Sequence, residues 1–144
     1  MKYFDELKKS MNYLAVNEKT IFIGQAVEVP GTAMTNTLKG INPKKLLELP
    51  VAEEMQMGIT TGLALDGNIP VSIFPRWNFV LLAMNQLINH LDKVNIMSNN
   101  GFKTKAIIRV NNKMFFIFML ANGHIYFNIG CVNIISVLFQ QSNI

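Results

Sequence analysis

The sequence predicts an α/β fold in which helices flank a mainly parallel sheet, and three observations lead to this prediction. From residue 21 onward, short β-branched segments alternate with longer segments of helical periodicity. Proline or glycine residues separate many of these segments. Half of the 144 residues are hydrophobic and 15% are charged, which allows a core and excludes intrinsic disorder. Alternating strands and helices are typical of parallel sheets, because each crossover helix returns the chain to the same edge.

The first elements are a helix and a strand. An amphipathic helix is predicted near the N-terminus, because apolar residues recur there at helical spacing: Phe4, Leu7, Met11 and Leu14. Residues 20–25 are β-branched and apolar, and they predict a strand that ends at Gly24. The Pro-Gly pair at 30–31 then indicates a loop.

The middle of the chain continues the alternation. Residues 46–50 predict a second strand closed by Pro50, and residues 53–67 predict a helix that ends at Gly67. Residues 69–74 predict a third strand.

One long helix and a fourth strand complete the pattern. Asn78 is a favourable N-cap, and residues 79–93 are apolar on nearly all sides, so we expect a buried helix of about four turns. The turn residues 99–101 follow, and residues 106–110 predict the fourth strand.

Gly58 and Gly62 lie four residues apart in the predicted helix 53–67. Each glycine costs about 1 kcal/mol relative to alanine in a helix, so we expect another element to approach this face closely. The helix is too polar for a membrane dimer motif, which leaves a neighbouring helix, of this chain or of another subunit, as the expected partner.

Composition excludes several classes of site and partner. A single cysteine, Cys131, rules out a disulfide framework and a cysteine-rich zinc site, and two histidines, His90 and His124, cannot form a three-histidine metal centre. The net charge of +4 arises after Asp92 from dispersed residues, without the dense basic run typical of nucleic-acid binding: Lys93, Lys103, Lys105, Arg109 and Lys113. Residues 1–15 mix acids and bases and do not form a secretory signal, so we expect a cytoplasmic protein.

Residues 111–144 differ from the rest of the chain, and we expect them to form a divergent apolar tail after a domain of residues 1–110. Residues 114–144 contain no Lys, Arg, Asp or Glu. Alternating apolar residues around Asn122-Gly123 indicate a hairpin. The uncharged run 114–139 is long enough for a membrane span, although interior polar residues disfavour insertion. A third interpretation is a truncated or frame-shifted end, in which the tail is no designed part of the fold and is disordered or improvised.

The expected sheet brings candidate site residues to one edge. In a parallel α/β sheet, functional groups gather at the carboxyl ends of the strands, here Gly24-Gln25, residues 50–54 and residues 74–79. Glu53 and Glu54 lie in the first turn of a helix, where they either stabilise the helix dipole or enter a cleft. The segment 74–79 contains three aromatic residues and Arg76, and its rings either plug the sheet edge or stack on a planar ligand. No GxxxxGK[ST], GxGxxG or GxSxG motif is present.

A series of short motifs runs through residues 1–110 in a fixed order: a strand ending at Gly24, Leu-Lys-Gly at 38–40, Pro-Val-Ala-Glu at 50–53, Gly58, Gly62, Gly67, Pro70, aromatic-Asn-aromatic at 77–79, Asn85-Gln86, Asn89 and Met97-Ser98. In these motifs and their order, residues 1–110 resemble the pyrimidine-binding domain of thiamine-diphosphate-dependent enzymes. The resemblance is greatest to the transketolase-like beta subunits of 2-oxoacid dehydrogenases. The family fold is an α/β domain, and here it looks incomplete at the C-terminus.

The resemblance implies a role for each candidate residue. Glu53 matches the glutamate that hydrogen-bonds a ring nitrogen of the cofactor's aminopyrimidine and so promotes deprotonation of the thiazolium carbon. Phe79 matches the ring that stacks on the pyrimidine, and Trp77 and Phe74 would form the same wall. An alpha-type partner subunit would bind the diphosphate and its Mg²⁺, so a homo- or hetero-oligomer is implied.

The sequence departs from the family in several places. Gln25 stands at the edge of the cofactor site where dehydrogenase beta subunits usually have an acid, and Pro75-Arg76 differs from the common pattern. After Val110 the family's histidine loop and C-terminal domain are not recognisable, and neither His124 nor His90 matches the family's substrate histidine.

The sequence therefore leaves two alternative hypotheses for the function of the chain. The first is part of an enzyme that performs 2-oxoacid decarboxylation or ketol transfer with an alpha-type partner. The second is a non-catalytic remnant of the family that acts as a binding or structural module.

Overall fold

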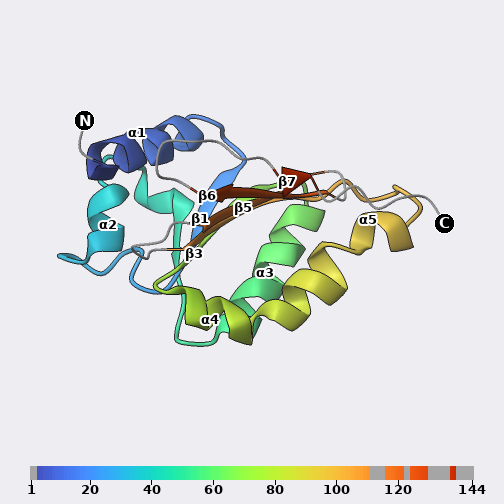
Figure 1. The fold of residues 1–144 in the computed structure, drawn as a ribbon. Helices are drawn as coiled ribbons and strands as arrows, with labels where there is room; N and C mark the ends of the chain where they lie inside the picture. Colours follow the sequence, from blue (N-terminus) through green and yellow to red (C-terminus); the bar gives the residue numbers. More distant parts are fainter. Residues whose placement is uncertain (1–2, 111–115, 122–123, 130–136, 139–144) are drawn as a thin grey trace.

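Four parallel strands form the part of the sheet that carries the candidate site (Figure 1). The computed structural model describes residues 3–110, 116–121, 124–129 and 137–138, and after residue 110 it describes the backbone alone. The four strands are β1 (Thr20–Gly24), β2 (Leu46–Glu48), β3 (Ile69–Phe74) and β4 (Lys105–Val110). They pair in the order β2-β1-β3-β4, and every pair among them is parallel. The predicted fold class is confirmed.

Three further strands extend the sheet beyond β4 with antiparallel pairing. They are β5 (Phe116–Ala121), β6 (His124–Ile129) and β7 (Val137–Leu138). Ala121 pairs with His124, so β5 and β6 form a hairpin whose two connecting residues, 122–123, lie outside the described residues. This pairing agrees with the hairpin interpretation of the tail. Within the described ranges, none of the helices combines the length and the hydropathy that a membrane span requires. The division of the chain at residue 110 stays a prediction.

One face of the sheet is covered by α1 (Tyr3–Ala15) and α2 (Ala33–Thr37) (Figure 1). Three of the four predicted apolar residues of α1 face the sheet, because Leu7 and Met11 are buried and Leu14 packs on the same core. Phe4, the fourth, is 41% exposed. The short α2 was not predicted. Its start is fixed by Thr32, whose side chain accepts a hydrogen bond from the backbone N–H of Thr35 at 3.0 Å. The core on this face consists of Leu7, Met11, Phe22, Val27, Met34, Leu38, Ile41, Val71, Ile73 and Ile107.

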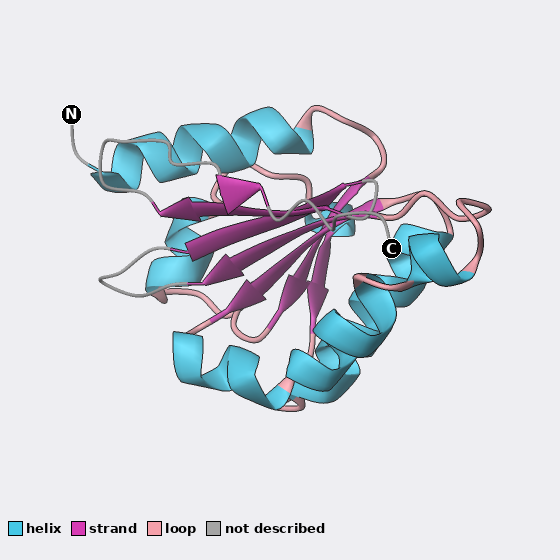
Figure 2. Ribbon diagram, turned by 45° about the vertical axis from the view of Figure 1, so that its right-hand side comes forward, coloured by secondary structure: helices cyan, strands magenta, loops and turns pink. Residues whose placement is uncertain are grey.

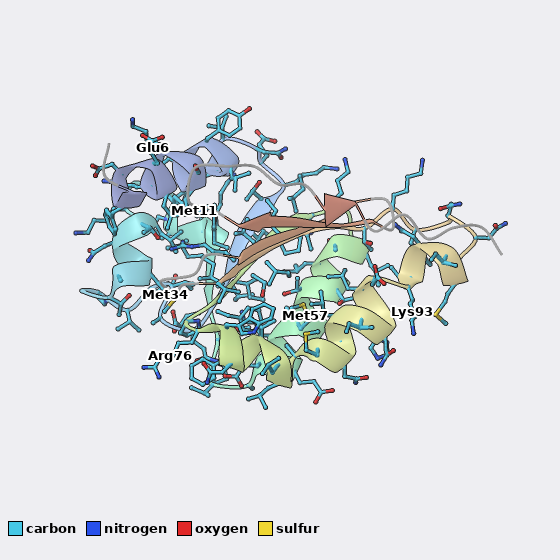
Figure 3. The ribbon with its side chains drawn as sticks, in the orientation of Figure 1. Glu6, Met11, Met34, Met57, Arg76 and Lys93 are labelled. Atoms are coloured by element: carbon cyan, nitrogen blue, oxygen red, sulfur yellow. The ribbon has the colours of Figure 1, made fainter. Side chains whose placement is uncertain are left out.

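The opposite face is covered by α3 (Glu53–Leu65), α4 (Trp77–Leu82) and the π-helical segment η2 (Gln86–Leu91), and the short α5 (Val94–Met97) follows η2. Figure 2 shows the twisted sheet between the two helical layers. Met11 and Met34 lie on one side of the sheet and Met57 on the other (Figure 3). The core on the α3 face consists of Met57, Ala64, Phe74, Val80, Ala83, Leu87, Leu91, Ala106, Ile108 and Val110. A single 3₁₀ turn, η1 (Pro43–Lys45), precedes β2.

The prediction of one buried helix over residues 79–93 is wrong. The helix begins at Trp77 with Arg76 as its N-cap, and α4 ends at Leu82, before the π-helical turn of η2. A π turn is wider than an α turn and shifts the residues that follow it around the helix axis. Leu87 and Leu91 therefore face the core, while Ile88 is 41% exposed. Apolar residues on nearly all sides of this segment did not indicate which face is buried.

The glycine pair of α3 has little packed against it. A β-carbon on Gly58 would lie 4.0 Å from Gln86 Oε1, and a β-carbon on Gly62 would meet no atom within 4 Å among the described residues. The expectation that a neighbouring element of this chain approaches closely is therefore not met in the described part. A neighbour from another subunit stays a prediction.

Candidate functional site

The carboxyl ends of the parallel strands meet at one edge, where the candidate site was predicted. Gly24 at the end of β1 pairs with Glu48 of β2 on one side and with Ile73 of β3 on the other. Gln25 follows β1 directly, and Glu53 is the first residue of α3. Trp77 begins α4, directly after the short link from β3.

Glu53 and Gln25 form a buried hydrogen-bonded pair. Gln25 Nε2 donates to Glu53 Oε1 at 3.2 Å. Glu53 is 6% exposed and Gln25 is 9% exposed. Glu53 Oε2 accepts no hydrogen bond from any residue that the structure describes, so the carboxylate has one oxygen held by the protein and one available. The start of α3 also favours negative charge at this position.

Glu54, the neighbouring glutamate, has a different environment. It is exposed, and its Oε1 accepts hydrogen bonds from Asn85 Nδ2 at 3.1 Å and from Gln86 Nε2 at 3.4 Å. These bonds join the start of α3 to the start of η2. Of the two glutamates, Glu53 is the one that faces the sheet edge, and Glu54 connects two helices.

Glu48 is a residue of this edge that the sequence did not single out. Its Oε1 accepts from the backbone N–H of Ala26 at 2.6 Å, and its Oε2 accepts from the backbone N–H of Glu28 at 2.8 Å. The carboxylate of β2 therefore holds the loop that follows β1. Its partners lie about twenty residues earlier in the chain, so no local signal could have revealed the contact.

Gln56 is a second polar residue that the sequence did not single out. It is fully buried one turn after Glu53, and its Nε2 donates to Ser72 Oγ at 2.9 Å and to the Ile73 carbonyl at 3.1 Å. Its Oε1 has no hydrogen-bond partner within the described part of the chain. A glutamine three residues after Glu53, on the same helical face, was the available signal.

The aromatic residues of 74–79 lie at the α3 face of the sheet. Phe74 is fully buried within the core, as the edge-plugging alternative predicts. Trp77 and Phe79 are half-buried and pack on the cluster that includes Met57, one turn beyond Glu53. The Arg76 guanidinium lies 5.9 Å from the centroid of the Phe79 ring, within the range of a cation–π contact. A ligand wall made by Phe74, Trp77 and Phe79 stays a prediction.

The remaining candidate residues lie elsewhere. His90 is exposed on η2, and it lines a cavity with Thr61, Leu65 and Phe102 that does not include Glu53. His124 begins β6, where the structure describes the backbone alone, and Cys131 lies outside the described residues. Among the residues with described positions, no group of three or more His, Cys, Asp or Glu side chains could hold a metal ion.

Comparison with known proteins finds relatives over three quarters of the chain. No family model matches. The chain is 30% identical over 111 residues to the pyruvate dehydrogenase E1 component subunit beta of Gracilaria tenuistipitata var. liui, which covers 74% of this chain and 34% of that protein. It is 24% identical over 113 residues to the 2-oxoisovalerate dehydrogenase subunit beta of Bacillus subtilis (strain 168), which covers 76% of this chain and 35% of that protein.

A third relative has a similar identity and coverage. The pyruvate dehydrogenase E1 component subunit beta of Rickettsia bellii (strain RML369-C) is 25% identical over 112 residues, which covers 75% of this chain and 34% of that protein. The chain thus spans about a third of the length of the curated relatives it matches.

Proposed function

The chain belongs to the family of 2-oxoacid dehydrogenase E1 beta subunits, and from this we propose that it binds the aminopyrimidine of thiamine diphosphate at the Gln25–Glu53 pair. The proposed activity is 2-oxoacid decarboxylation or ketol transfer, carried out together with an alpha-type partner subunit. The buried Glu53 carboxylate, with one oxygen held by Gln25, is the observation that carries this proposal.

The residues present fit the aminopyrimidine. A ring nitrogen that carries or receives a proton needs a carboxyl group with a free oxygen, and Glu53 Oε2 offers one within the described part of the structure. Because Glu53 is 6% exposed, a hydrogen bond made there is stronger than the same bond in water. Gln25 adds an amide that fixes the orientation of the carboxylate.

The protein residues would tune the cofactor rather than react with the substrate. When bound, thiamine diphosphate supplies the nucleophilic carbon and the electron sink for decarboxylation. Glu53 would hold a proton at the pyrimidine ring nitrogen, and its burial would exclude water from that proton. Phe79 would stack on the pyrimidine, with Trp77 in the same wall, and the fully buried Phe74 belongs to the core cluster on which both rings pack.

The other half of the site is proposed to come from the partner. The sequence has no phosphate-binding motif, and phosphate groups with Mg²⁺ need such a cradle. We therefore propose that an alpha-type subunit binds the diphosphate and Mg²⁺, in a homo- or hetero-oligomer. The proposed compartment is the cytoplasm.

Calorimetric titration with thiamine diphosphate and Mg²⁺ tests this proposal. The chain alone should bind weakly, and the alpha-type subunit of the same source should raise the affinity at least tenfold. Glu53→Gln should abolish cofactor activation of the complex, while Glu54→Gln, the same change at the adjacent exposed residue, should leave it intact. Equally tight binding by the lone chain would refute the shared site. A folded complex without cofactor binding would favour the non-catalytic alternative.

A further inference from the structure

We propose that Glu48 is a positioning residue, which holds Gln25 in place so that Gln25 can orient the Glu53 carboxylate. This inference rests on the proposed function for its catalytic meaning, but its structural part stands on contacts in the chain itself. Glu48 is half-buried at the end of β2, and its carboxylate is hydrogen-bonded to the backbone of the loop after β1. It would act only through Gln25.

Both carboxylate oxygens of Glu48 accept hydrogen bonds from the loop after β1. Oε1 accepts from the N–H of Ala26 at 2.6 Å, and Oε2 accepts from the N–H of Glu28 at 2.8 Å. Hydrogen bonds to an ionised acceptor are shorter and stronger than neutral ones. Two such bonds from one carboxylate fix both the position and the orientation of the loop.

The backbone on both sides of Gln25 is hydrogen-bonded to the end of β2 or to the residue that follows it. Before it, the Gly24 carbonyl accepts from the N–H of Leu49 at 2.9 Å. After it, the N–H of Ala26 donates to Glu48. Glu48, the last residue of β2, and Leu49, which follows it, therefore hold the peptide groups on either side of Gln25.

The backbone at Ala26 shows that this loop conformation is imposed. Ala26 has a φ of +56°, in the left-handed region that non-glycine residues rarely adopt. Its N–H is held by Glu48, and its carbonyl accepts from the hydroxyls of Thr32 at 3.2 Å and Thr35 at 2.8 Å. A residue keeps such an unfavourable conformation only when surrounding contacts hold it there. Of these three hydrogen bonds to the Ala26 backbone, only the one with Glu48 involves a charged side chain.

The hydrogen bonds and the chain itself connect Glu48 to Glu53 by two routes. Glu48 holds Ala26, Ala26 follows Gln25, and Gln25 donates to Glu53. Glu53 in turn follows Glu48 after four residues, 49–52, which link β2 to α3. Loss of the Glu48 contacts would release the backbone at Gln25 and weaken the bond to Glu53. A residue that only stabilised the loop would leave the Gln25 side chain where it is.

Nuclear magnetic resonance of the full chain without cofactor distinguishes these two roles. Glu48→Gln keeps the side-chain volume but leaves one acceptor for two amides. Glu28→Gln is the matched control, because it makes the same change in the same loop at an exposed side chain. We expect hydrogen exchange at Ala26 and Glu28 to rise at least tenfold in Glu48→Gln, and the Gln25 side-chain amide resonances to move toward those of a free glutamine. Glu28→Gln should change neither.

Two results would overturn the positioning role. The first is faster exchange at Ala26 with unchanged Gln25 side-chain resonances, which would show a loop-stabilising residue alone. The second is unchanged exchange in Glu48→Gln. If Glu48→Gln does not fold, Glu48→Asp replaces it, since the shorter carboxylate keeps both acceptors and should give a smaller shift in the same direction.

A measurement of cofactor binding distinguishes failure of this inference from failure of the proposed function. Thiamine diphosphate with Mg²⁺ should bind the complex of Glu48→Gln with the alpha-type subunit about tenfold more weakly than the wild-type complex. Absence of binding by the wild-type complex would refute the proposed function, while the Gln25 resonances would still decide whether Glu48 positions Gln25. Unchanged affinity together with shifted Gln25 resonances would overturn the link between positioning and cofactor binding.

Discussion

Gly24 and Ile73 approach so closely that a β-carbon on residue 24 would lie 2.3 Å from the Ile73 carbonyl oxygen. The contact joins the ends of β1 and β3, and Gln25 is the residue that follows Gly24. Because the obstacle is backbone within a paired strand, it cannot move aside as a flexible side chain could. The site edge therefore requires glycine at this position.

Gly24→Ala should destabilise the protein by about 2–4 kcal/mol, since overpacking against backbone forces the two strands apart. Chemical denaturation monitored by circular dichroism measures this change. A loss below about 0.5 kcal/mol would show that β1 and β3 are not held as closely as their register indicates.

Gly62→Ala should have the opposite effect. Gly62 lies inside α3, and a β-carbon there meets no atom within 4 Å among the described residues. Alanine in a helix interior is favoured over glycine by about 1 kcal/mol, so we expect the melting temperature of the chain to rise by about 2–4 °C. If a subunit packs closely on this face, the same variant should weaken assembly, which sedimentation velocity of the complex would detect.

Much of the fold could be predicted because its signals are local. The third strand was predicted with the bounds that it has, Ile69–Phe74, since a β-branched run there lies between turn residues. The short α2 and the π turn of η2 depend on tertiary contacts instead. In α2 a threonine cap starts a helix without apolar periodicity, and in η2 packing of Leu87 and Leu91 selects the buried face.

The site could be predicted only in part for the same reason. Glu53 and Gln25 were candidates because each follows a strand, but their pairing depends on the strand order β2-β1-β3, which alternation of elements does not determine. Glu48 contacts the loop after β1 and Gln56 contacts β3, in both cases through residues distant in sequence. Polar residues within a strand or helix give no local sign of such partners.

Gln56 and Ser72 should be energetically coupled. Gln56→Met removes the buried hydrogen bonds to Ser72 Oγ and the Ile73 carbonyl, and we expect a loss of about 1–2 kcal/mol in the free energy of unfolding. Removal of the buried Gln56 Oε1, which lacks a partner in the described residues, offsets part of this cost.

A double-mutant cycle with Ser72→Ala isolates the contact between the two side chains. The coupling energy should be about 0.5–1.5 kcal/mol, so that the double variant is more stable than the sum of the single losses indicates. Strict additivity would mean that the hydrogen bond between Gln56 and Ser72 contributes nothing to stability.

Phe79 should contribute to cofactor affinity if it stacks on the pyrimidine. An aromatic pair is worth about 0.5–1.5 kcal/mol beyond buried area, so Phe79→Leu should weaken thiamine diphosphate binding by the complex about 2- to 10-fold. Phe102→Leu is the matched control, because Phe102 is 51% exposed beyond α5. Calorimetry gives both affinities, and melting curves show whether each variant keeps its fold. Equal affinities in the two folded variants would assign Phe79 to the core of the α3 face and exclude it from the cofactor site.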